Sequence, residues 1–238
     1  MTVSEDTPIK RPDLAIYSQK ELWAAGSQPT WDSPDIITND WRPFQLRAEA
    51  EVIIRNLSPD TPAANAIVHY EISPFGIGTR RERVLSQQVN VAASSQVNLV
   101  FPLHQSTLGG DPRTGVHIVI DHPHDSNPGN NEGSQVHDGG YTTESGRQFS
   151  VQIPVVNDAP VPRVIELSVG ATPLIATVSP NSRTFQPFEQ VIARLDIEIP
   201  GNMHGTNADP VNTSATVMAT LEDGTLIGGV TRLVRVDD

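Results

Sequence analysis

The side chains with the greatest potential for chemistry lie close together in residues 120–140, IDHPHDSNPGNNEGSQVHDGG. His122 and His124 are two residues apart, so both imidazoles would project to the same side of an extended chain. Nearby carboxylates could add the oxygen ligands that Zn²⁺ or Ca²⁺ accepts in proteins. The candidate metal ligands are Asp121, His122, His124, Asp125 and Glu132.

The same stretch also has the composition of a long polar loop, and this interpretation explains more of it. Asn and Asp side chains bond to nearby backbone groups in turns, and Gly adopts positive φ angles. The residues of DSNPGNNEG are therefore those that favour turns. Pro123 and Pro128 stiffen the chain without bringing three or four ligands together. As an EF-hand loop, the stretch has Pro where the third ligand belongs and lacks the central Gly. We therefore expect a loop between two strands, with no metal and no other cofactor.

Catalytic motifs are missing from the sequence. It contains no G-x-S-x-G elbow, no HExxH pair and no P-loop, and GIG at 76–78 is too short for a dinucleotide fingerprint. The absence of cysteine excludes thiolate metal sites, cysteine nucleophiles and disulfides. A pair of carboxylates for glycoside hydrolysis stays open, because their separation depends on tertiary structure. We expect no catalytic residues and no enzymatic activity.

Composition and charge narrow the class of protein further. The 238 residues include 17 Gly and 20 Pro without a repeating period, which is typical of an all-β protein with many turns. A net charge of −12 disfavours binding to nucleic acid, and the one basic cluster, residues 80–83, is interpreted as a solvated strand end. No apolar run approaches the length of a membrane span. The N-terminus lacks the apolar region of a secretory signal, so we expect a cytoplasmic protein or part of a particle exported by another route.

Period-2 alternation recurs along the chain and predicts β-strands. In AEAEVIIR, residues 48–55, Ala50, Val52 and Ile54 share one face with Ala48. AIVHYEIS, VNLVF, VHIVID and FSVQIPV alternate in the same way, and about seven such strands read as an antiparallel sandwich. The second part continues with VIARLDIEI and with a hairpin at Asp223-Gly224. The predicted fold class is all-β, with two Ig-like antiparallel β-sandwich domains in tandem.

The proline-bearing stretch VNDAPVPR, residues 156–163, marks the expected boundary between the two domains. We expect residues 1–156 to form an N-terminal arm plus an Ig-like sandwich, and residues 163–238 to form a smaller β-sandwich. The two parts show a faint internal similarity. Each part contains a strand, a polar loop and an Ala-containing strand in that order. The two segments are AEVIIRN…TPAANAIVHYEIS and ARLDIEIP…DPVNTSATVMATL.

One segment of the chain has a strand that ends in Arg-Asn, a short Pro-containing loop and then the strand AANAIVHYEI. This order resembles the bacterial cell-adhesion-related (CARDB-type) Ig-like domains. The matching positions are Asn56 and residues 63–70, and the resemblance extends over about residues 33–156. The chain departs from the family at Leu57-Ser58, where a Gly is usual, and in its long final loop. The resemblance implies a non-catalytic module used for adhesive or structural interactions, and as fold analogy it does not name a ligand.

The three tryptophans, Trp23, Trp31 and Trp41, lie in an arm that precedes the first clear sandwich strands. Either this arm folds back over an edge of its own sheet, or a tryptophan stays exposed to anchor a partner. We expect the arm mostly to fold back, with one tryptophan open, and name all three as candidate partner-binding residues.

These observations favour a non-catalytic structural or interaction protein that forms part of a larger assembly. The expected partners are other protein subunits, including copies of the chain itself; candidate settings are a cell-surface layer, a phage or contractile particle, or an enzyme complex. One alternative is a carbohydrate-binding module that uses exposed tryptophans. A second alternative, which we rank last, is a metal-dependent enzyme whose metal is bound by the His/Asp loop.

Overall fold

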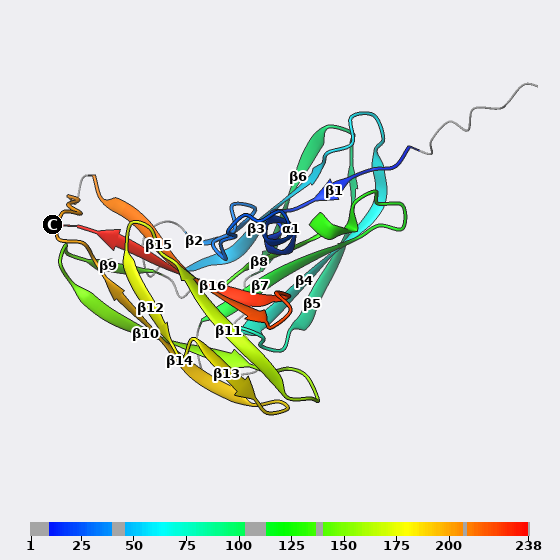
Figure 1. Cartoon of the computed structure of the whole chain (residues 1–238). Helices are drawn as coiled ribbons and strands as arrows, with labels where there is room; N and C mark the ends of the chain where they lie inside the picture. Colours follow the sequence, from blue (N-terminus) through cyan, green and yellow to red (C-terminus); the bar gives the residue numbers. More distant parts are fainter. Residues whose placement is uncertain (1–9, 40–45, 103–112, 137–139, 207–208, 238) are drawn as a thin grey trace, which may run out of the picture.

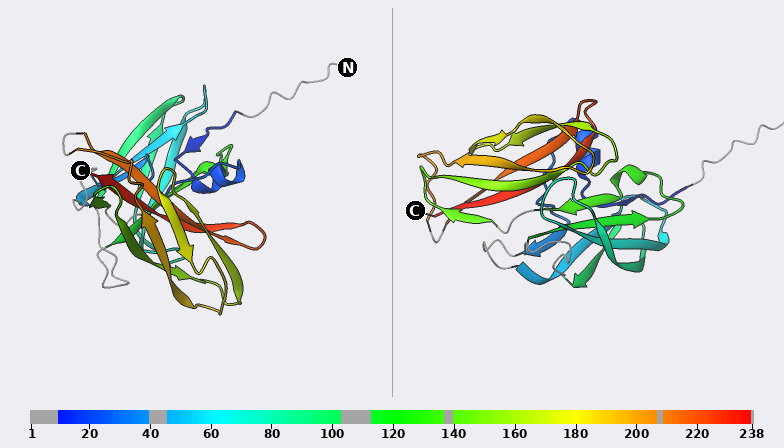
Figure 2. Two further views of the ribbon diagram at one scale, coloured as in Figure 1. Left: turned by 60° about the vertical axis from the view of Figure 1, so that its left-hand side comes forward. Right: turned by 90° about the horizontal axis from the view of Figure 1, so that it is seen from below.

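Two β-sandwiches lie side by side in the computed structural model, joined by the N-terminal arm and by a loop of the first sandwich (Figures 1 and 2). The structure describes residues 10–39, 46–102, 113–136, 140–206 and 209–237. No helix in these ranges is long and apolar enough to span a membrane.

The first sandwich contains eight strands and the single α-helix of the described residues. In its first sheet, β3 pairs with β6 along one edge and with β1 and β2 along the other. The second sheet has the order β5–β4–β7–β8, all antiparallel. The elements are β1 (Leu14–Ala15), α1 (Gln19–Ala24), β2 (Ile36–Asn39), β3 (Leu46–Asn56), β4 (Ala63–Pro74), β5 (Glu82–Val91), β6 (Ser95–Pro102), β7 (Thr114–Asp121), the 3₁₀ turn η1 (Pro128–Asn130) and β8 (Glu132–Gln135).

The second sandwich contains the remaining eight strands. One sheet has the order β10–β14–β12, and the other has the order β13–β11–β15–β16–β9. Among these strands, only β9 runs parallel to its neighbour, β16. The elements are β9 (Tyr141–Thr143), β10 (Gln148–Val156), β11 (Arg163–Gly170), β12 (Ile175–Ser179), β13 (Ser182–Phe185), β14 (Gln190–Glu198), β15 (Val211–Leu221) and β16 (Leu226–Val236).

The two sandwiches share one strand connectivity. In chain order, β3, β4, β5, β6, β7 and β8 make the same pairings as β10, β11, β13, β14, β15 and β16. In each sandwich the first and fourth of these strands are paired in one sheet, and the other four lie side by side in the second, as in Ig-like sandwiches. The predicted fold class, two Ig-like sandwiches in tandem, is confirmed.

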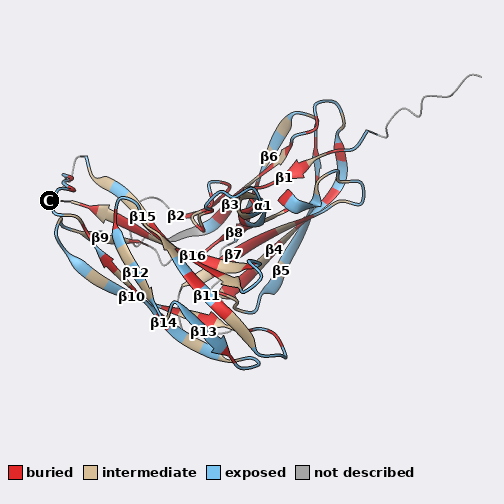
Figure 3. Cartoon of the chain, viewed as in Figure 1, coloured by how far each residue is buried: buried red, intermediate tan, exposed pale blue. Residues whose placement is uncertain are grey.

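Alternating burial holds each pair of sheets together, as the period-2 pattern predicts. Ala50, Val52 and Ile54 on β3 are fully buried, whereas the alternate positions are partly or fully exposed. Figure 3 shows the same alternation along other strands of both sandwiches. The predicted hairpin also forms: Gly224 has φ +82°, and the Asp223 carboxylate accepts a hydrogen bond from the backbone N–H of Thr225.

The expected boundary at residues 156–163 is wrong, because β10 belongs to the second sandwich. β10 pairs with β14 along its whole length, and Val151, Ile153 and Val155 lie in the second core. The Pro-containing stretch after β10 is therefore a connection inside one sandwich. The change from the first sandwich to the second falls between β8 and β9, so over the described residues the second sandwich has as many strands as the first.

A buried asparagine lies at the end of equivalent strands, β3 and β10, in the two sandwiches. The Asn56 side chain donates to the carbonyls of Thr61 and Val91. The Asn157 side chain donates to those of Val161 and Gln186. Each amide oxygen accepts from the backbone N–H two residues later in the chain.

The internal similarity therefore aligns RNLSPDTPAANAIV with VNDAPVPRVI. The match to ARLDIEIP is wrong, because that segment is β14, the counterpart of β6.

Replacing Asn56 or Asn157 by alanine is expected to lower the free energy of unfolding by ~2 kcal/mol in each case. The reason is that buried backbone groups lose their side-chain partner. Urea titrations of both variants would measure this. Asn98→Ala, at an exposed position of β6, provides a matched control, and a cost no larger than that control would contradict the prediction.

Candidate functional site

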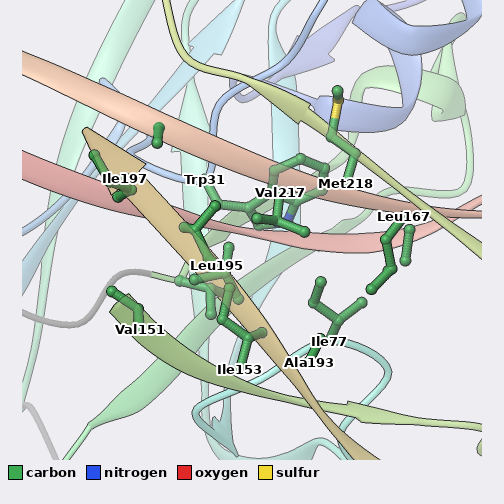
Figure 4. Close-up of a cluster of buried hydrophobic side chains, with 14 of the residues drawn as sticks. Trp31, Ile77, Val151, Ile153, Leu167, Ala193, Leu195, Ile197, Val217 and Met218 are labelled. Atoms are coloured by element: carbon green, nitrogen blue, oxygen red, sulfur yellow. The ribbon is translucent and has the colours of Figure 1, made fainter. Parts of the chain in front are cut away.

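The N-terminal arm is buried in both sandwiches and joins them. Leu14 and Ile16 are part of the first core. Trp31 is only 3% exposed and lies in the second core, near Ile77, Leu195 and Val217 (Figure 4). The arm is therefore internal structure that passes from one hydrophobic core to the other.

Backbone hydrogen bonds fix Trp31 between β8 and β16. The Trp31 N–H donates to the hydroxyl of Thr231, and the Trp31 carbonyl accepts from the N–H of Val136. The Val136 carbonyl in turn accepts from the N–H of Thr231. The indole ring lies against Gly229, where any Cβ would overlap it. Chain segments from three parts of the sequence thus meet at one point.

The loop that follows β4 makes the second connection. Ile77 is buried in the second core and forms a parallel bridge with Val155. Its N–H donates to the Pro154 carbonyl at 2.8 Å, and its carbonyl accepts from the Val156 N–H at 2.9 Å. Gly78 has φ +69°, and a Cβ there would overlap the Val156 carbonyl oxygen, so this close approach requires glycine.

A cleft of about 700 Å³ lies beside this joint and is lined by the arm and by both sandwiches. The first sandwich contributes the loop after β4, and the second contributes β16 and the β13–β14 turn. Its charged lining residues are Lys20, Arg80, Arg81, Glu132 and Asp158. Its volume falls in the range of sites that hold small molecules or peptide side chains. This cleft is the candidate functional site.

Glu132 is the centre of the charge network in the cleft. Lys20 and Arg81 each contact a different oxygen of its carboxylate, at 2.6 Å in both cases. Burial alone would raise the pKa of Glu132, but the two cations outweigh burial and hold the pKa below its ordinary value. Glu132 is thus an ionised anchor that keeps Lys20 and Arg81 in place.

His117 lies in the cleft lining and is almost fully buried. Its two ring nitrogens contact the hydroxyls of Ser73, at 2.9 Å, and Ser134, at 2.8 Å. Burial, followed by the positive charges of Arg81 and Lys20, lowers its pKa well below the ordinary value. A Ser–His pair suits nucleophilic catalysis, but Ser73 has no exposed surface, and both ring nitrogens face hydroxyls, so no carboxylate orients His117. This group of three side chains therefore stabilises the fold.

Because His117 is held neutral, the protein is expected to lose stability as the pH falls below ~6.5, by up to ~1.4 kcal/mol per pH unit. Between the lowered folded pKa and ~6.5, only the unfolded chain binds the proton. Urea titrations at pH 7.5 and 5.5 would measure the loss. His117→Gln removes the titrating group, so it should lose less stability over this interval than the natural chain. Equal losses in the two proteins would contradict the prediction.

The polar loop at 120–140 does not bring the candidate metal ligands together. The Asp125 carboxylate accepts from the backbone N–H groups of Leu14 and Asn127. His122 contacts the Ala64 carbonyl and the backbone N–H of His124, Asp121 is exposed at the end of β7, and Glu132 faces Lys20 and Arg81. Within the described ranges, no group of three or more His, Asp or Glu residues is placed to bind a metal. The loop holds the arm: Ser126 and Asn130 make backbone bonds to Pro12 and Ile16.

The tryptophans have different surroundings from those expected of partner anchors. Trp31 is buried, so its expected role as a surface anchor is wrong. Trp23 is half-buried, and its indole N–H donates to the Gly224 carbonyl at 3.0 Å in the β15–β16 turn. Trp41 lies outside the described residues. The expectation that the arm folds back is supported, although it enters two cores and does not merely cover an edge.

Sequence patterns alone do not identify several residues of the cleft. His117 occupies an outward position of the alternating VHIVID strand, and Lys20 belongs to no basic cluster or motif. The nearest indication in the sequence is the basic cluster at 80–83, and its interpretation as a solvated strand end is only partly right. Arg81 binds Glu132 in the cleft, and Arg83 binds Glu71. The GIG motif by itself gives no sign of its contact with β10.

No protein family and no curated protein matches the chain. Among solved structures, Escherichia coli alpha-2-macroglobulin activated by porcine elastase matches at 9% identity and TM-score 0.33, covering 97% of this chain and 22% of that one. A protein of unknown function from Porphyromonas gingivalis W83 matches at 12% identity and TM-score 0.26, over 82% and 93% of the two chains. CBD12 from CALX1.2 matches at 11% identity and TM-score 0.22, over 73% of each chain. The chain spans about a fifth of the alpha-2-macroglobulin chain. Matches this remote carry no argument about function.

Proposed function

We propose that the protein is a non-catalytic interaction protein that acts as a component or accessory of a larger assembly. The observation that carries the proposal is the joint between the sandwiches, where Trp31 and Ile77, both from the first part of the chain, are buried in the second core. Such a joint fixes the two sandwiches in one orientation. It makes surfaces that extend over both of them, including the cleft, permanent features to which another protein can bind.

The chemistry of the described residues supports an interaction role over catalysis. His117, which lines the cleft, is almost fully buried together with its partners Ser73 and Ser134, and Glu132 is occupied by two cations. Trp31 and Trp23 are engaged within the chain, which removes the main support for a carbohydrate-binding module. The net charge of −12 is also unsuited to general binding of nucleic acid.

We further propose that the sandwiches are CARDB-type modules that mediate adhesive or structural contacts. The resemblance rests on Asn56 and the strand after it, and the recurrence of the same hydrogen-bonded corner at Asn157 supports it. A cell-surface layer, a phage or contractile particle, and an enzyme complex are the settings in which a two-domain module of this kind would act, with other proteins or copies of itself as partners.

The proposal is tested by the native mass of the full chain in extracts of its source cells. A tag on the chromosomal gene, gel filtration of a gently prepared extract and cross-linking would detect the assembly. We expect the protein to elute far above 25.8 kDa and to cross-link to defined neighbours. Elution as a free monomer without cross-linked neighbours, under conditions that preserve known complexes of the same cell, would overturn it.

A further inference from the structure

The cleft beside the joint carries more positive than negative charge, although the whole chain is strongly acidic. Lys20, Arg80 and Arg81 line it, together with Glu132 and Asp158. Glu132 is already paired with two of the cations. Arg80 is exposed and makes no ion pair or side-chain hydrogen bond to any described residue. An available guanidinium beside a partly exposed ion-pair network is suited to bind an anionic group of a ligand.

The backbone of the same wall offers further donors. From Gly78 to Arg81 the chain leaves the bridge to β10 and has not yet entered β5. Over the described residues, the backbone N–H groups of these four positions have no protein acceptor. Unpaired N–H groups next to guanidinium groups favour ligands rich in acceptor oxygens, such as carboxylates.

The second sandwich contributes apolar side chains to the cleft. Phe188, in the β13–β14 turn, is 66% exposed and has φ +58°, an uncommon conformation for a bulky side chain. Ile227 lies in the same lining, and the Phe188 N–H donates to the carbonyl of Ala159 in the β10–β11 loop, where Val161 is 52% exposed. An exposed aromatic ring in a strained turn at a cleft is a feature of ligand-binding surfaces.

We propose that the interdomain cleft binds an acidic peptide segment of a partner protein, with a carboxylate at Arg80 and a large apolar side chain against Phe188. The inference rests on the proposed function and specifies the chemistry of the partner. We favour a peptide over a neutral saccharide because a carboxylate is a stronger partner for the guanidinium of Arg80 than a hydroxyl. The net negative charge of the chain repels an acidic peptide elsewhere on its surface, so the attraction comes from the cations of the cleft.

The first experiment selects ligands from a phage-displayed library of random twelve-residue peptides on the immobilised full chain. Phage that also bind a double variant, which carries both Arg80→Glu and Phe188→Ser, are removed. We expect the enriched peptides to be acidic and to carry at least one Phe, Leu, Ile or Trp. Enrichment of basic or purely polar peptides, or no enrichment over the variant, would overturn the proposal.

Affinities of the selected peptides, labelled with fluorescein and measured by anisotropy, then test the two contacts. Arg80→Glu and Phe188→Ser should each weaken binding about 10-fold or more, and a high concentration of NaCl should weaken it further. Arg147→Gln, an exposed arginine outside the cleft, is the matched control and should leave affinity unchanged. Equal affinity of all variants would refute the assignment, as would tighter, Arg80-dependent binding of oligogalacturonate than of any peptide.

The same substitutions in the chromosomal gene separate this inference from the proposed function. If Arg80→Glu and Phe188→Ser proteins stay folded by circular dichroism and leave the high-mass complex, the cleft is the docking site. If they stay in the complex, the inference fails while the proposed function stands. If the natural chain is itself monomeric, the proposed function fails.

Discussion

Replacing Trp31 by alanine is expected to lower the free energy of unfolding by roughly 3–5 kcal/mol, a large share of the stability of a typical domain. The indole is buried among residues of the second core and is packed against Gly229, so its loss leaves a cavity at the joint. The backbone bonds of Trp31 to Val136 and Thr231 do not replace the lost packing. Urea unfolding followed by circular dichroism would measure the change.

Trp23→Ala is the matched control for this experiment, because both residues are tryptophans of the same arm. Trp23 is half-buried, packs against the outside of the second core and donates one hydrogen bond to Gly224, so its replacement should cost less, ~1–2 kcal/mol. Similar costs for the two variants would show that the arm does not depend on burial of Trp31 in the second core.

The two sandwiches are expected to differ completely in their ability to fold alone. The first core consists only of residues between Leu14 and Ile120, so a fragment of residues 10–136 should fold. The second core includes Trp31, Phe75, Ile77 and Val136, and a fragment of residues 140–238 lacks all four. We expect this fragment to be unfolded or molten, because the missing side chains leave its core open.

Amide NMR spectra of the two fragments would measure this asymmetry. Residues 10–136 should give dispersed resonances, whereas residues 140–238 should give narrow dispersion until the first fragment is added. Well-dispersed spectra from 140–238 alone would contradict the prediction. Unfolding of 10–136 would show that the first sandwich also depends on its neighbour.

Local pattern in the sequence predicts the longer strands but not short ones such as β8 and β13, and it does not assign strands to domains. Alternation over residues such as Val52 and Ile54 depends on neighbours two positions away, so the sequence shows it directly. The prolines that follow FSVQIPV favour its assignment to the first sandwich, but its partner is β14, about forty residues later in the chain. Pairing over such separations is a tertiary property that composition does not encode.

The candidate site is unpredictable for the same reason. Trp31 is as apolar as any exposed anchor, and its burial follows from the glycine at 229, some two hundred residues away. His117 alternates outward on β7 and is buried only because other segments cover that face. Residues 122–131 of the polar stretch form a loop, as their Asn, Asp and Gly content predicts, but residues 132–135 form strand β8, which this content does not indicate. The contact of the loop with the arm through Asp125 depends on residues distant in the sequence.

The parallel pairing of β9 with β16 determines how the second sandwich responds to tension. β9 lies near the entry of the chain into this sandwich and β16 near its exit, and the two run side by side at Val234, Arg235 and Val236. A pull on the two ends of the sandwich moves these strands in opposite directions along their length. Their hydrogen bonds are then sheared together, whereas an antiparallel hairpin pulled from its open end would separate one bond at a time.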